Sequence, residues 1–251
     1  MKSTIFKFFS LFSVIRLYNI LVVILAQYLT AIFILDDQKD LLVTILDPYL
    51  FVIILCSSIS IASGYIINNF YDYEKDIINR PIRSNIDRSI RKRTKLNLYF
   101  SLNLLCIILS LYISVRAVIF FLVYNIILWL YSHKLKKILI LGNVLSSLLT
   151  ITPFFAIFLY YKNFSDIIPV YALFLFFIIL AKDLVKDLEN LKGDFTLNYK
   201  TIAVVYGEKF SKIAITSIII INYIVVISLI LYFDIGLMFY YYYLCLLVLS
   251  F

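Results

Sequence analysis

Charged residues are scarce in this sequence: only 15% of its 251 residues are Asp, Glu, Lys or Arg, whereas 63% are hydrophobic. A soluble domain carries about 25% charged residues, so this composition excludes a soluble protein. Cysteine and histidine are scarce as well. Cys56, Cys106 and Cys245 lie in apolar runs without CxxC or Cys/His spacing, which excludes a cysteine metal site and a disulfide framework. The single histidine, His133, lies in a short basic turn with no carboxylate nearby in sequence, and we interpret it as a solvated loop residue.

Long apolar runs fill the rest of the chain, and the mean hydropathy is +0.99. A transmembrane helix needs about 20 apolar residues, and eight runs approach or exceed that length. We therefore expect an all-α polytopic membrane protein in which two tandem four-helix halves, residues 1–132 and 133–251, surround a central cavity. The predicted spans are 17–35, 41–67, 96–115, 117–132, 138–161, 167–182, 213–233 and 237–251.

Basic residues are distributed very unevenly between the two sides of these spans. Twenty lie in the N-terminal segment or after spans two, four and six, whereas three lie on the other side. By the positive-inside rule, the N-terminus and these three connections are cytoplasmic, and the protein is expected in the cytoplasmic membrane. We interpret the basic run 91–95 (RKRTK) as an anchor to anionic lipid head groups, and we do not expect nucleic-acid binding.

Seven of the nine acidic residues on the cytoplasmic side fall into two groups, at the ends of spans two and six. In the first group Asn68, Asp72 and Asp76 are spaced by four, which places them on one helical face. The spacing of the second group also places its members on one face of a helix. This group consists of Asp183, Asp187, Asn190 and Asp194, and we expect Gly193 to end that helix before Asp194.

Two acidic stripes at corresponding positions predict a shared cation site. Polar residues also gather at helix ends simply because head groups begin there, but two matching stripes favour a function. Mg²⁺ prefers carboxylate oxygens and is usually held by one or two carboxylates together with substrate phosphates. A diphosphate substrate is therefore expected, with its remaining charge neutralised by nearby bases. These bases are Lys75, Arg80, Arg83, Lys134, Lys136 and Lys186.

Both groups resemble the signatures of the UbiA-type intramembrane prenyltransferases. Residues 64–83 resemble the first signature, NDxxDxxxD followed by an Arg-Pro segment, and residues 182–194 with Lys200 and Thr201 resemble the second. Residues 131–137 (YSHKLKK) are similar to the family's segment of tyrosine and basic residues between helices four and five. The similarity extends over nearly the whole chain, in order and spacing.

The resemblance implies a Mg²⁺-dependent reaction in which a polyprenyl diphosphate, such as geranylgeranyl diphosphate, ionises to an allylic carbocation that a membrane-associated acceptor attacks. It assigns metal and diphosphate binding to Asn68, Asp72, Asp76, Asp183, Asp187 and Asp194, with Asp72, Asp76, Asp183 and Asp187 as the catalytic carboxylates. It assigns substrate binding to Arg80, Lys134 and Lys136, and further to Lys75, Arg83, Tyr131, Arg16 and Asn19.

The chain departs from the family pattern at a few positions. Asn69 and Asn190 replace aspartates and Lys182 replaces an arginine, so we expect modest metal affinity. The family usually has nine helices, and we expect the ninth to be absent here.

The spacing around Asp76 and the Lys-Gly-Asp ending of the second motif are most similar to the branch that alkylates glycerol-phosphate lipids. An aromatic acceptor, as in quinone biosynthesis, remains an alternative, as do a carboxylate-based secondary transporter and an inactive homologue. A CDP-alcohol phosphatidyltransferase is excluded because its motif requires Asp-Gly, and the chain contains no such dipeptide.

Overall fold

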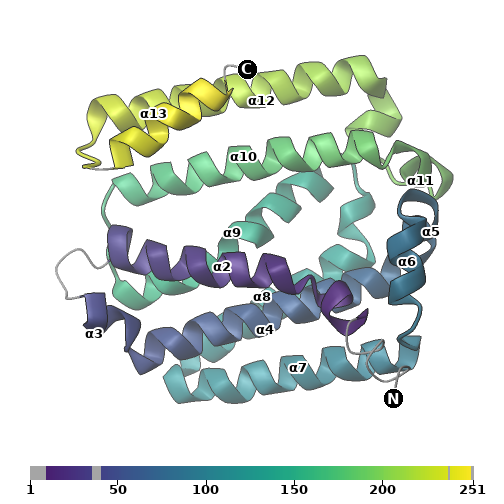
Figure 1. Cartoon of the computed structure of the whole chain (residues 1–251), viewed down its shortest axis with the longest axis horizontal. Helices are drawn as coiled ribbons and strands as arrows, with labels where there is room; N and C mark the ends of the chain where they lie inside the picture. Colours follow the sequence, from purple (N-terminus) through teal and green to yellow (C-terminus); the bar gives the residue numbers. More distant parts are fainter. Residues whose placement is uncertain (1–9, 36–40, 237, 250–251) are drawn as a thin grey trace. The chain divides into compact units, whose positions relative to one another are not determined.

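The computed structural model describes residues 10–35, 41–236 and 238–249, and every regular element in these ranges is a helix (Figure 1). The elements are α2 (Leu17–Thr30), the π-helix η1 (Ala31–Leu35), α3 (Leu41–Ile45), α4 (Pro48–Tyr71), α5 (Tyr73–Asn79), α6 (Pro81–Asp87), α7 (Lys92–Ile113), α8 (Val115–His133), the 3₁₀-helix η2 (Leu135–Lys137), α9 (Leu141–Tyr161), α10 (Ile167–Glu189), α11 (Leu191–Thr196), α12 (Ile202–Tyr232) and α13 (Met238–Leu249).

Seven helices in the described ranges are long and apolar enough to cross a membrane, and a shorter apolar helix follows them. The prediction of a multi-pass, all-α membrane protein is therefore confirmed. The first seven predicted spans correspond to the seven long helices, and the eighth corresponds to the shorter helix α13.

The second predicted span, 41–67, was wrong at its start. The structure divides it into α3 and α4 because Pro48 lacks the N–H needed to continue α3. Asp47 then caps α4, since its carboxylate accepts hydrogen bonds from the backbone N–H groups of Tyr49 (2.9 Å) and Leu50 (3.3 Å).

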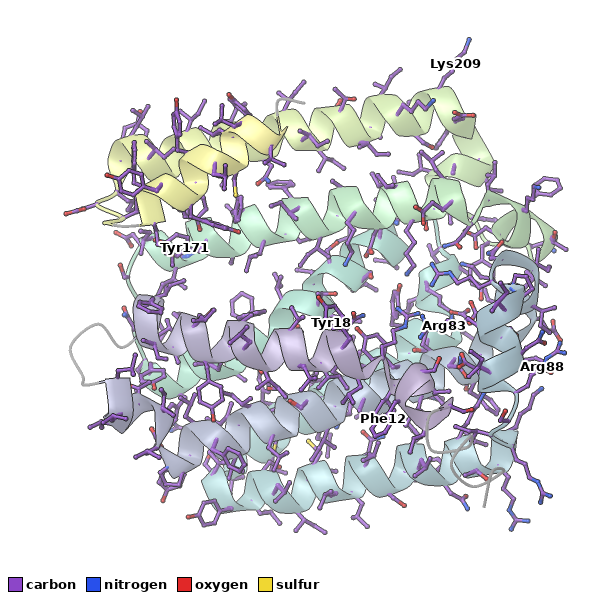
Figure 2. The ribbon with its side chains drawn as sticks, in the orientation of Figure 1. Phe12, Tyr18, Arg83, Arg88, Tyr171 and Lys209 are labelled. Atoms are coloured by element: carbon purple, nitrogen blue, oxygen red, sulfur yellow. The ribbon has the colours of Figure 1, made fainter. Side chains whose placement is uncertain are left out.

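The seventh predicted span, 213–233, was too short, because α12 begins at Ile202. Gly207 interrupts the first turns of α12 with φ of 80°, a left-handed conformation that favours glycine. Lys209 and Lys212, which lie just before the predicted span, are exposed on the next turns of α12, and Figure 2 shows Lys209 pointing away from the helix.

The chain forms two compact units, and the first contains residues 1–135 and 152–163. Its central helix is α4, which packs against α2, α7 and α8. Small residues allow this close packing, as expected between membrane helices. The Cys56 thiol donates to the carbonyl of Cys106 (3.7 Å) and the Cys106 thiol donates to that of Cys56 (3.6 Å), so both cysteines are buried hydrogen-bonding groups between α4 and α7.

The second unit contains residues 136–151 and 164–251. Its longest contact is between α10 and α12, which run alongside one another (Figure 1). The core cluster of this unit is formed by Phe174, Val226, Leu229, Ile235 and Tyr242. Tyr242 brings α13 into the core by stacking on Tyr171 of α10, with 5.9 Å between ring centroids.

Candidate functional site

The first acidic motif lies in the first unit, where α4 ends and the short helix α5 begins. Asp72 occupies the break, with φ of −86° and ψ of 7°. The hydrogen bonds nevertheless continue across it: the N–H of Asp72 donates to the carbonyl of Asn68, and the N–H of Asp76 donates to that of Asp72, each at 2.8 Å. The helical hydrogen bonds through Asn68, Asp72 and Asp76 are therefore continuous, although Asn68 and Asp76 lie on two helices and Asp72 lies between them.

A small pocket opens beside this break, and it collects five of the predicted site residues. Asn68, Asp76, Arg16, Arg80 and Arg83 all line it. Its other lining residues are Val14, Tyr65 and Asn69. Three guanidinium groups thus meet one carboxylate in the pocket, an excess of positive charge that favours an anion with several oxygen acceptors.

Arg16 is held in the pocket at a cost in backbone energy. It lies immediately before α2 with φ of 51° and ψ of 53°, a left-handed conformation that is unfavourable for a residue with a Cβ atom. Its guanidinium lies 5.0 Å from the ring centroid of Tyr65, and the Tyr65 hydroxyl accepts a hydrogen bond from Asn19 (3.3 Å). The predicted pair of Arg16 and Asn19 therefore converges on Tyr65 of α4, and this convergence fixes the direction of the guanidinium.

Electrostatics in the pocket follow from this crowding. Burial, followed by the neighbouring guanidinium of Arg83, lowers the pKa of Arg16. Burial, followed by the carboxylate of Asp72, raises the pKa of Asp76, although Arg16 and Arg80 oppose that shift. The guanidinium groups of Arg16 and Arg83 therefore repel each other, and so do the carboxylates of Asp76 and Asp72. A bound anion would reduce the first repulsion and a bound cation the second.

The second acidic motif, in the second unit, has a break of the same kind. Asn190 lies between α10 and α11 with φ of −93° and ψ of 9°. Its carbonyl accepts from the N–H of Asp194 at 3.1 Å, as the carbonyl of Asp72 accepts from Asp76. The expectation that Gly193 ends the helix before Asp194 was wrong, because Gly193 lies inside α11 and the interruption falls at Asn190.

Two carboxylates of the second motif, those of Asp183 and Asp194, are buried. Asp183 is 8% exposed, and its buried Oδ2 receives no hydrogen bond from any residue that the structure describes. Asp194 is fully buried. Asp187 accepts a hydrogen bond through Oδ2 from the amide of Asn143 on α9, at 2.8 Å. Sequence reasoning missed Asn143, because no local pattern links it to a residue 44 positions away.

The side chains of the two motifs supply oxygen donors, which Mg²⁺ prefers. In the described part of the chain, no three His, Cys, Asp or Glu side chains come together to form a metal-binding group. Mg²⁺ does not need such a cage, because it commonly keeps several waters and uses one or two carboxylates with substrate phosphates. The buried Asp183 oxygen without a hydrogen-bond donor is the kind of ligand that a cation satisfies. The residues present therefore fit Mg²⁺.

The connection between the two units contains the predicted basic segment. Tyr131 lies half-buried near the end of α8, Lys134 is exposed just after that helix, and Lys136 lies half-buried in η2.

The interpretation of His133 as a solvated loop residue was wrong. His133 ends α8 and packs between Trp129 and Tyr71, with ring centroids 5.7 Å and 5.0 Å away. Spacing of four along the helix places Trp129 beneath it, a signal that was available in the sequence.

The basic residues around α5 and α6 divide into two groups. Lys75 is half-buried on α5, whereas Arg88 and Lys92 stack on the ring of Tyr73, and Figure 2 shows Arg88 on the outer side of α6. The head-group anchor predicted at 91–95 was wrong for Lys95, which is only 3% exposed. Its ammonium group donates a hydrogen bond to the amide oxygen of the Asn69 side chain, at 2.6 Å.

Comparison with known proteins decides the family. Residues 13–251 match the model of the UbiA prenyltransferase family. The chain belongs to this family. A digeranylgeranylglyceryl phosphate synthase of Methanobrevibacter smithii is 31% identical over 222 residues, which cover 83% of this chain and 73% of that protein. The corresponding enzyme of Thermococcus gammatolerans is 33% identical over 163 residues, or 64% of this chain. The chain spans 58% of the length of that relative.

Solved structures of UbiA relatives share the fold. A UbiA homologue from Archaeoglobus fulgidus, bound to DMAPP and Mg²⁺, superposes with a TM-score of 0.74 at 15% identity, covering 95% of this chain and 86% of that one. A structure from work on digeranylgeranylglyceryl phosphate synthase superposes with a TM-score of 0.68 at 23% identity, covering 97% of this chain and 85% of that one. The predicted family and fold class are therefore confirmed.

Proposed function

We propose that this protein transfers a polyprenyl group from a prenyl diphosphate to a membrane-associated acceptor with a glycerol-phosphate head group. The observation that supports it most is the pocket in which Arg16, Arg80 and Arg83 surround Asn68 and Asp76. Guanidinium groups bind phosphate oxygens in bidentate fashion, and three of them suit a highly charged head group. The relatives named digeranylgeranylglyceryl phosphate synthase support a glycerol-phosphate acceptor over an aromatic one.

Mg²⁺ is the proposed cofactor, and the A. fulgidus homologue bound to it together with a prenyl diphosphate supports this choice. The residues that would bind Mg²⁺ are Asn68, Asp72 and Asp76 in the first unit and Asp183, Asp187 and Asp194 in the second. When bound, Mg²⁺ neutralises the negative charge that develops on the departing pyrophosphate. Asn143 would keep Asp187 oriented through its hydrogen bond of 2.8 Å.

The reaction breaks the bond between the prenyl C1 carbon and the diphosphate oxygen, which leaves pyrophosphate and an allylic carbocation. The three arginines hold the phosphate oxygens while this charge separates, and Lys75, Lys134, Lys136 and Tyr131 are assigned the outer oxygens. An acceptor hydroxyl oxygen then attacks the cation, forms the ether bond and releases its proton.

The reaction is assigned to the cytoplasmic side of the cytoplasmic membrane. The basic residues of the sequence support this orientation, since 20 of the 23 fall on the side that carries both acidic motifs. A prenyl diphosphate would then enter with its head group from the aqueous side and its chain in the lipid.

The test is product analysis with purified protein in lipid. Labelled geranylgeranyl diphosphate and Mg²⁺ are supplied with a panel of glycerol-phosphate and aromatic acceptors, and products are identified by mass spectrometry. We expect a prenyl ether of the glycerol-phosphate acceptor, no product after chelation of Mg²⁺, and loss of pyrophosphate release in Asp72→Asn and Asp187→Asn.

Asp166→Asn is the matched control, because Asp166 is an exposed aspartate at the start of α10, distant in sequence from either motif. It should retain wild-type turnover. Full turnover in Asp72→Asn or Asp187→Asn would contradict the assignment of these carboxylates. Transfer to an aromatic acceptor alone would replace the proposed acceptor, and no transfer to any acceptor would overturn the proposed function.

A further inference from the structure

A chain of part-buried polar contacts extends from the arginine pocket, and of its residues the sequence-based assignment included only Arg83. Asn69, beside the first motif, donates through its amide nitrogen to Oδ2 of Asp87 (2.8 Å) and accepts through its amide oxygen from Lys95 (2.6 Å). Asp87 also accepts from the hydroxyl of Ser13 (3.0 Å), and Nε of Arg83 lies 3.9 Å from its Oδ2. We call these five residues the Asp87 relay.

The relay joins four segments of the first unit. Ser13 belongs to the helical turn 10–15 that precedes α2, and Asn69 lies in the last turn of α4. Asp87 is the last residue of α6, and Lys95 lies in the first turn of α7. Arg83 and Asp87 both lie on α6, but every other contact of the relay joins two different segments. Helical spacing in the sequence therefore does not predict the relay.

Two formal charges are buried in the relay, since Asp87 is 5% exposed and Lys95 is 3% exposed. Buried charges are tolerated when they are hydrogen-bonded to compensating groups. Asn69 supplies both kinds of group at once, because its oxygen faces the ammonium and its nitrogen faces the carboxylate. An aspartate at position 69 would place a second carboxylate against Asp87, which explains why the neutral residue suits this chain.

The relay also reaches the pocket through Arg83, whose Nη2 donates to the backbone carbonyl of Ser13 at 2.6 Å (Arg83 is labelled in Figure 2). Ser13 precedes the strained Arg16 by three residues, and Arg80 is the N-cap residue of the helix that Asp87 ends. Asp87 therefore links the last turn of α6 to the turn that leads to Arg16. The same carboxylate lies 3.9 Å from Arg83 and is joined to the other two pocket arginines through short stretches of chain.

We propose that Asp87, Asn69 and Lys95 are positioning residues that preorganise the arginine pocket for the diphosphate. Asp87 and Lys95 are not among the residues that line the pocket, and Asn69 lines it; we assign all three to the placement of Arg16, Arg80 and Arg83 and not to catalysis. The expected effect on catalysis rests on the proposed function. The pairing of Lys95 and Asp87 through Asn69 does not depend on it.

The test exchanges the charges along the relay. Asp87→Asn removes the carboxylate that acts most strongly on Lys95, and Asn69→Asp sets two carboxylates against each other. The double variant Asn69→Asp with Asp87→Asn restores one carboxylate, now directly beside Lys95, and the new amide at 87 can still accept from Ser13. We expect each single variant to raise KM for geranylgeranyl diphosphate about tenfold, the effect of losing one charge-assisted hydrogen bond, with a smaller change in kcat. The double variant should return to within about twofold of wild-type KM.

A second readout does not depend on catalysis. Hydrogen exchange of the backbone amides in residues 80–88 should speed up in each single variant and slow again in the double variant. Glu208→Gln is the matched control, because it breaks a 2.7 Å ion pair with Lys212 in which both side chains are about two-thirds exposed (65% and 67%), and it should change neither readout.

The two ideas fail separately. If the wild-type protein transfers no prenyl group but exchange follows the rescue pattern, the proposed function is wrong and the relay stands. If the double variant is as impaired as the single variants together, in KM and in exchange, the relay is wrong whatever the enzyme does. Rescue of exchange without any change in KM would confine the relay to stability and overturn its positioning role.

Discussion

Replacing Gly142 with alanine tests how tightly the second unit holds its basic turn. A Cβ atom at Gly142, the second residue of α9, would lie 2.7 Å from the carbonyl oxygen of Lys136 and 3.1 Å from its carbonyl carbon. Both are backbone atoms, so rotation of a side chain cannot relieve the contact. Helix propensity favours alanine over glycine by up to about 1 kcal/mol, whereas forcing an extra carbon into packed structure costs about 1–3 kcal/mol. Because the contact is with backbone atoms, the upper part of that range applies, about 2–3 kcal/mol, and the helix-propensity gain reduces it to a net loss of about 1–2 kcal/mol.

The assay is thermal unfolding of purified protein in detergent micelles. A loss of this size should lower the unfolding temperature by about 2–8 °C for a chain of this length. Gly64→Ala is the matched control, because a Cβ there would meet only side-chain carbons of Leu128 at 3.3 Å, and these can move. Gly142→Ala should be the less stable of the two and should also raise KM for the prenyl donor by displacing Lys136. A Gly142→Ala protein as stable as wild type would refute the reasoning.

Two further substitutions probe single side chains of the site. Asn143→Ala removes the donor to Asp187 and should lower kcat by about tenfold while raising the Mg²⁺ concentration required for half-maximal rate, as expected for a residue that orients a metal ligand; unchanged Mg²⁺ dependence would exclude that role. Lys134→Ala removes an exposed cation and should raise KM for the prenyl diphosphate without changing the unfolding temperature, whereas an unchanged KM would remove Lys134 from the site.

The transmembrane helices were predictable because an apolar run of sufficient length has few alternatives in a membrane. The ends of those runs were predicted less well, and even the break at Pro48 was missed because the run 41–67 is apolar on both sides of it. The start of α12 was missed because Lys209 and Lys212 are exposed along the helix instead of ending it. Long basic side chains can lie along a helix and reach polar surroundings, so a lysine in sequence is a weak boundary signal.

The acidic stripes were predictable because their spacing repeats the helical period. The contacts that hold them were not. Asn143 bonds to a residue 44 positions away, and Lys95 bonds to one 26 positions away, so only the packing of helices brings them together. Lys95 also shows how composition misleads: four of the five residues in the run 91–95 are basic, and the run reads as one surface patch, yet its last member points inward to Asn69.

The helix breaks at Asp72 and Asn190 affect the orientation of the acidic residues that follow them in the two motifs. On an uninterrupted helix, residues four apart are offset by about 40° around the axis, so Asn68 and Asp76 would differ by about 80°. Asp and Asn side chains compete with the helical backbone for hydrogen bonds and therefore favour helix ends. Asp72 and Asn190 each lie between a long helix and a short one, and the break allows the short helix to take a different direction. The N–H of Asp76 or Asp194 still donates to the carbonyl of the residue at the break. The direction of the last carboxylate in each motif is thus set by a polar residue four positions earlier, and the same solution appears independently in each unit of the chain.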